Sequence, residues 1–82
     1  MPSTPLPCCA GAASTHVQEL PHVHQFDFDL CQCTRCARYW VFAWREEQGG
    51  WEPVTLEDAA RMQSLNGAEL TAFVKSWATS FS

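Results

Sequence analysis

The sequence predicts an α+β domain in which a three-stranded antiparallel sheet is followed by a C-terminal helical hairpin. Two observations carry this prediction. Apolar and polar side chains alternate with a period of two across residues 23–31, which is typical of a half-buried strand. From residue 55 onward, capping residues precede apolar side chains at helical spacing, which is typical of amphipathic helices.

The chain is small enough that its apolar core needs support. Its 82 residues form one domain near the size at which burial alone is marginal, and such chains often add disulfides or a structural metal. An apolar content of 46% indicates a packed fold rather than a disordered chain. The formal charge of −4 supplies no basic field for phosphates, which makes general nucleic-acid binding the weaker expectation.

Cysteine usage bears on compartment and chemistry. No stretch approaches the roughly 20 apolar residues of a membrane span, and the N-terminus lacks the basic start and apolar run of a secretory signal. We therefore expect a reducing, cytoplasmic location. Five cysteines are an odd number, which fits a disulfide framework poorly, so their clustering favours metal or redox chemistry.

The β region is expected over residues 8–54, behind a flexible leader at residues 1–7 that carries three prolines. Residues 16–20 could form a short strand, which Pro21 would end. The alternation over residues 23–31 predicts the first long strand of the sheet. One face of that strand takes His24, Phe26, Phe28 and Leu30, and the opposite face takes Gln25, Asp27 and Asp29.

The second half of the β region is rich in aromatic residues. Residues 39–44, YWVFAW, predict a strand suited to a pleated surface. The polar segment 45–50 ends in two glycines, which predicts a hairpin connection of ordinary length. Pro53 cannot donate to a ladder of hydrogen bonds, so residues 51–54 form an edge strand at most.

Two helices are expected over residues 55–82, packed on the sheet. Thr55 can cap the first helix, with Asp58 in the first turn, where negative charge is favoured. Asn66 can cap the second, and Glu69 three residues later completes a capping-box pattern. The second helix carries an apolar stripe that we expect to face the strands: Leu70, Phe73, Val74, Trp77 and Phe81.

A metal site is predicted at the tip of the central hairpin. Cys33 and Cys36, in the motif C-T-R-C, lie between two predicted strands. Two cysteines at this spacing on a tight turn can direct both sulfurs at one point about 2.3 Å away, as a tetrahedral zinc ion requires. Amides of such a turn can also donate to the thiolates. A closed structural site needs two further ligands.

Strand geometry ranks the remaining candidates. His24 lies seven residues before Cys31, roughly 23 Å along an extended strand, so His22 and His24 fit poorly as ligands. If the chain reverses near residues 20–22, His16 comes close to the cysteine turn, and the loop that holds Cys9 can reach the same end. The favoured site is therefore Cys9, His16, Cys33 and Cys36 with a structural Zn²⁺ ion. Alternatives that could replace one of these ligands are Cys8, Cys31, His22 and His24.

The order strand, cysteine turn, strand and third strand, with ligands on two loops, resembles the zinc-ribbon families over residues 6–54. The first ligand turn of such families reads C-P-x-C-G, and residues 6–11 of this chain read L-P-C-C-A-G. Pro7 and Cys9 match that pattern, whereas Leu6 and Ala10 depart from it. The resemblance implies that His16 or Cys8 supplies the ligand missing at Leu6. The helical region after residue 54 lies outside it.

Three classes of function follow from this site. The favoured one is a non-enzymatic module with a structural zinc ion that binds another protein through exposed aromatic residues, because four tryptophans exceed what a small core hides. Nucleic-acid binding by a zinc ribbon is an alternative, to which Arg35, Arg38 and Arg45 could contribute. A dithiol redox or metal-sensing protein is another, although such a dithiol needs a helix N-terminus beside it. No enzymatic activity is expected, since the chain offers little room for a catalytic pocket.

Overall fold

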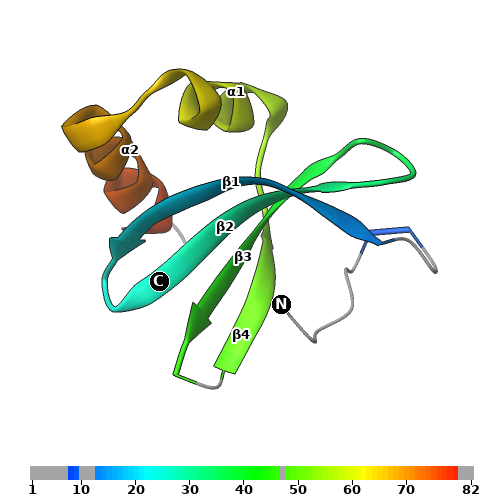
Figure 1. Ribbon diagram of the computed structural model, residues 1–82, viewed down its shortest axis with the longest axis horizontal. Helices are drawn as coiled ribbons and strands as arrows, with labels where there is room; N and C mark the ends of the chain where they lie inside the picture. The colour runs from blue at the N-terminus through cyan, green and yellow to red at the C-terminus, as the bar shows by residue number, and fades with distance from the viewer. Residues whose placement is uncertain (1–7, 10–12, 47, 80–82) are drawn as a thin grey trace.

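The computed structural model describes residues 8–9, 13–46 and 48–79, so the expected leader at residues 1–7 and Phe81 lie outside the described residues. The described elements are β1 (Ser14–Val23), β2 (Phe26–Cys33), β3 (Tyr39–Arg45), β4 (Gln48–Pro53), α1 (Leu56–Ser64) and α2 (Gly67–Thr79). The strands form one antiparallel sheet in the order β1-β2-β3-β4 (Figure 1). The α+β class is thus confirmed, but the sheet has four strands rather than the three predicted.

The first hairpin turns later in the chain than predicted. Its two turn residues, His24 and Gln25, have φ angles of 54° and 68°, and positive φ at both central positions is the geometry of a type I′ turn. The prediction that His24 belongs to the strand over residues 23–31 is therefore wrong. Type I′ turns usually have the sequence Asn-Gly or Asp-Gly. The pair His-Gln does not match this preference, so the sequence did not predict the turn here.

Pro21 does not end the first strand, which continues to Val23. The pairing of β1 with β2 shifts in register between Leu20 and Val23, so Pro21 lies at an irregularity of an edge strand. Both are positions at which the missing amide of proline is tolerated. Gly49 meets a different constraint in β4, because a Cβ atom there would lie 2.6 Å from Cζ of Phe42.

Both helices begin where the capping residues predict. The hydroxyl of Thr55 accepts a hydrogen bond of 3.0 Å from the amide of Asp58, which is the expected N-cap interaction. The second helix begins directly after Asn66, at Gly67, whose φ of +60° suits a residue without a Cβ atom. No helix in the described part of the chain combines the length and apolar character needed to cross a membrane.

The two helices cover one face of the sheet (Figure 1). Leu70 and Val74 of the predicted stripe are buried, and Phe73 and Trp77 pack against the same core. The strands contribute side chains from alternate positions, namely Phe28, Leu30, Val41 and Ala43. The prediction that the stripe packs on the sheet is confirmed for its described members. The opposite face carries Cys31, Cys33, Trp40, Phe42 and Trp51, and the rings of Phe42 and Trp51 meet edge to face at 4.9 Å.

Candidate metal centre

The turn between β2 and β3 is shaped by backbone hydrogen bonds around Cys33. The amide of Cys33 donates to the carbonyl of Arg38 at 2.9 Å, and the amide of Ala37 donates to the carbonyl of Cys33 at 3.1 Å. The amide of Arg35 donates to the sulfur of Cys33 at 3.4 Å. The turn therefore closes on the Cys33 side chain and directs amides at its sulfur, as expected for a metal-binding cysteine turn.

A second set of hydrogen bonds ties the N-terminal segment to this turn. Both the amide and the hydroxyl of Thr34 donate to the carbonyl of Ala13, each at 3.1 Å. Ala13 directly precedes β1, so these bonds hold the start of β1 against the turn. Cys8 and Cys9 form a bend, which lets two adjacent side chains turn to the same side rather than alternate as in a strand.

Four sulfur atoms meet at this place. The Sγ atoms of the cluster all lie within 4.8 Å of one another, and the cluster consists of Cys8, Cys9, Cys33 and Cys36. Sγ of Cys8 is 3.2 Å from Sγ of Cys36 and 3.9 Å from that of Cys9. A tetrahedral ion with zinc–sulfur bonds of about 2.3 Å needs sulfurs about 3.8 Å apart. The four sulfurs are thus grouped closely enough to hold a metal ion such as zinc.

The cluster favours a thiolate at one position. Hydrogen bonds from the backbone amides of Cys36 and Arg35 lower the pKa of Cys33 to about 6, against the opposing effect of burial. Hydrogen bonding to Cys36 and then to Cys33 raises the pKa of Cys9 to about 12. A lowered pKa favours the thiolate of Cys33, which is the form of cysteine that binds metals.

Trp40 lies at the edge of the cluster. Only 8% of this residue is exposed, and its indole Nε1 is a buried atom without a hydrogen-bond partner among the described residues. The hydrogen bond to Cys36 raises the pKa of the Cys8 thiol most, whereas the indole N–H of Trp40 acts in the opposite direction. An N–H group close to a sulfur favours the thiolate, the form that a metal requires.

Three of the four predicted ligands come together, and His16 does not join them. Cys9, Cys33 and Cys36 belong to the cluster, and Cys8 takes the fourth place. His16 lies opposite Cys31 in the β1–β2 ladder, and its Nε2 is 3.1 Å from Oδ1 of Asp29. The sequence shows that Cys8 and Cys9 are adjacent, which could have suggested that both join the site. Their two sulfurs reach the same point only because the chain bends there, and the sequence does not predict this bend.

The remaining candidates stand apart from the cluster. Cys31 is buried, and its sulfur donates to the carbonyl of Asp29 at 3.8 Å. His22 and His24 lie at the β1–β2 turn, the end of β2 opposite Cys33, as the strand geometry predicts. Nδ1 of His22 is 2.9 Å from Oδ1 of Asp27.

No protein-family model, no curated protein and no solved structure matches this chain.

Proposed function

We propose that this protein is a small, non-enzymatic protein-interaction module in which a structural zinc ion is held by Cys8, Cys9, Cys33 and Cys36. The observation that carries the proposal is the meeting of four sulfurs from two distant segments within 4.8 Å. Closed sites of four thiolates are a standard form of structural zinc. The ion would fasten the N-terminal segment to the β2–β3 turn.

The charge of the surroundings supports this site. Four thiolates leave a bound zinc ion with excess negative charge, which nearby cations reduce. Arg35 belongs to the same turn, is exposed, and forms no ion pair with a carboxylate among the described residues. The indole N–H of Trp40, which is buried and has no hydrogen-bond partner among the described residues, would be available to donate to a metal-bound sulfur. Donors around the sulfurs tune and orient the ligands of metal sites.

The cluster contains cysteines alone, whereas the site predicted from the sequence mixed cysteine and histidine ligands, which suit zinc. Tetrahedral sites of four sulfurs accept either zinc or iron. A rubredoxin-like iron site would be expected to use two C-x-x-C pairs, whereas one half of this site is the adjacent pair Cys8 and Cys9. We therefore propose zinc. Visible absorption typical of an iron–thiolate centre would contradict this choice.

Two features count against catalysis or dithiol exchange. Cys33 ends a strand and Cys36 lies in the following turn, whereas a thioredoxin-like dithiol lies at a helix N-terminus. All four sulfurs are needed to close the metal site, and a catalytic zinc ion keeps an open position for water or substrate. The ion is therefore proposed to stabilise the fold and to take no part in a reaction.

The test is native mass spectrometry of protein purified in reducing buffer without chelator. We expect one zinc ion per chain, lost on substitution of a ligand such as Cys33→Ala or Cys36→Ser. Cys31→Ala is the matched control, because Cys31 is buried on the same strand as Cys33 but lies outside the cluster. His16→Ala distinguishes the two ligand sets. Zinc retained in Cys36→Ser, or lost in His16→Ala, contradicts the proposed site.

A further inference from the structure

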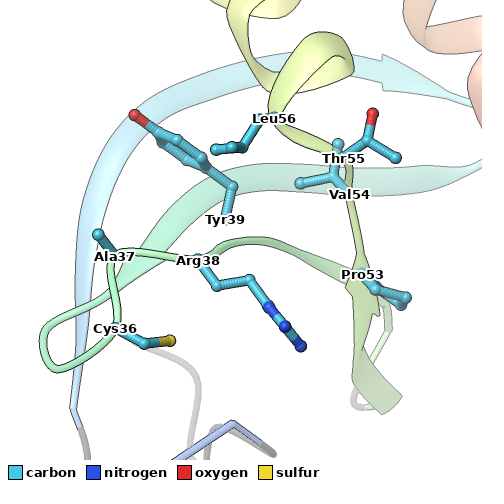
Figure 2. Close-up of a pocket in the computed structure, with 8 residues that line it drawn as sticks. All are labelled: Cys36, Ala37, Arg38, Tyr39, Pro53, Val54, Thr55 and Leu56. Carbon is cyan, nitrogen blue, oxygen red and sulfur yellow. The ribbon is translucent and has the colours of Figure 1, made fainter.

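A groove runs beside the cysteine cluster, between the β2–β3 turn and the segment that connects β4 to α1. It has a volume of about 640 Å³ and is lined by residues 36–39 and 53–56 (Figure 2). We call it the turn–helix groove. Its volume lies within the range of about 300–1,000 Å³ that is usual for ligand-binding sites. Its wall includes Cys36, so the groove and the proposed metal site share the same turn.

The walls of the groove are mainly apolar. Leu56 is 71% exposed, and the other exposed large apolar residue in the described part of the chain is Trp44, which does not line the groove. The side chain of Leu56 points toward the ring of Tyr39 across the groove (Figure 2). Val54 is buried and lies near them. Leu56, Tyr39 and Val54 therefore give the groove an apolar wall, which is usual for binding sites.

The lining of the groove includes one positively charged side chain. Arg38 is the only charged residue among those that line the groove. Its guanidinium group makes no ion pair within the described residues, and its side chain extends in the direction of Pro53, away from Tyr39 and Leu56 (Figure 2). Glu57 and Asp58 follow Leu56 on α1 but do not line the groove. A carboxylate would therefore be attracted at the Arg38 end and repelled beyond Leu56, which gives the groove a direction.

We propose that the turn–helix groove binds a peptide segment of a partner protein in which a large apolar side chain stands next to an aspartate or glutamate. The apolar side chain would lie against Leu56, Tyr39 and Val54, and the carboxylate would pair with Arg38. This inference rests on the proposed function as a protein-interaction module. Of the four tryptophans from which the sequence predicted an aromatic interaction surface, Trp40 is buried, Trp51 and Trp77 are half-buried, and Trp44 is exposed but does not line the groove.

The test begins with selection of short random peptides displayed on phage against the immobilised wild-type protein in reducing buffer. An enriched peptide is synthesised with a fluorophore and titrated by fluorescence anisotropy. We expect enriched peptides to share an apolar residue beside an acidic one. Leu56→Ser and Arg38→Gln should each weaken the binding by at least about tenfold, which corresponds to about 1.4 kcal/mol.

The chain offers a matched control for each variant. Trp44→Ser removes the other exposed large apolar side chain in the described part of the chain, and Lys75→Gln removes an exposed cation of α2 that does not line the groove. Both should bind the peptide as the wild type does, and circular dichroism should show every variant folded. No enriched peptide, enrichment without acidic residues, or affinity that depends on Trp44 rather than Leu56 overturns the proposal.

The zinc content of each sample, measured by native mass spectrometry, separates the two proposals. Peptide binding that depends on Leu56 and Arg38 in protein without zinc would support the groove and contradict the metal site. Zinc-loaded protein whose peptide binding is indifferent to both substitutions would support the metal site and overturn the groove.

Discussion

Two buried cysteines of β2 differ in acidity although they are only two positions apart on the same face of the strand. Burial, followed by the nearby charge of Asp29, raises the pKa of Cys31 to about 11. Backbone amides of Cys36 and Arg35 lower the pKa of Cys33 to about 6. The difference arises from the turn, which supplies N–H donors to one sulfur and none to the other. Local backbone geometry therefore determines which thiol is suited to ligation.

Cys31 gives the protein a predictable response to alkaline pH. Above the ordinary thiol pKa of 9.0 the unfolded chain releases the Cys31 proton, whereas the folded chain retains it until about pH 11. The folded state then binds more protons than the unfolded state, so the free energy of unfolding falls as pH rises across this interval. Cys31→Ala should flatten this fall. Urea unfolding of both proteins below pH 9 and near pH 11 measures it, and parallel decreases would contradict the assignment to Cys31.

At the scale of single elements, the β3–β4 hairpin depends on a glycine that lies beneath an aromatic ring. A Cβ atom at Gly49 would approach Cζ of Phe42 to 2.6 Å, whereas one at Gly50 would meet nothing within 4 Å. Gly49→Ala should therefore lower the free energy of unfolding by about 1–3 kcal/mol, the usual cost of overpacking. Gly50→Ala is the control and should be neutral or slightly stabilising. Urea unfolding compares them, and equal effects would show that Phe42 moves aside freely.

Helices were easier to predict from this sequence than strands, for a physical reason. Thr55 and Asn66 mark helix starts through local interactions within a single turn, and both helices begin where these residues predict. Strand bounds depend on pairing with another strand. The turn at His24 and Gln25 has neither glycine nor asparagine. Its position is therefore set by the pairing of the flanking strand residues rather than by a preference of the turn residues themselves.

The same limit explains the fourth member of the cysteine cluster. Whether His16 or Cys8 reaches Cys33 depends on the register of β1 against β2, and that register shifts twice, between His16 and Gln18 and between Leu20 and Val23. Such bulges are local responses to packing and leave no clear trace in composition. The C-x-x-C turn itself, Cys33 to Cys36, is local and was predictable.

Over the whole molecule, two separate features hold the chain together. The apolar core lies between the helices and one face of the sheet, with side chains from all four strands or their immediate ends. The cysteine cluster lies on the other face, at the end of β2, and joins residues 8–9 to the β2–β3 turn. Because a chain of 82 residues buries a limited core, the proposed metal should supply a substantial share of the stability.

Removal of the metal should therefore weaken the fold and loosen one end of it first. At free zinc about 1,000-fold above its dissociation constant, linkage predicts a loss of about 4 kcal/mol in the free energy of unfolding on chelation. Urea unfolding with and without chelator measures this loss. Hydrogen exchange locates it: the amides of Cys33, Thr34 and Ala37, which bond within the turn or to Ala13, should lose protection before those of Leu30 and Val41, which belong to the central pair of strands. An unchanged unfolding midpoint after complete loss of zinc would show that the helix-covered core is sufficient by itself, and the ion would then have no structural role.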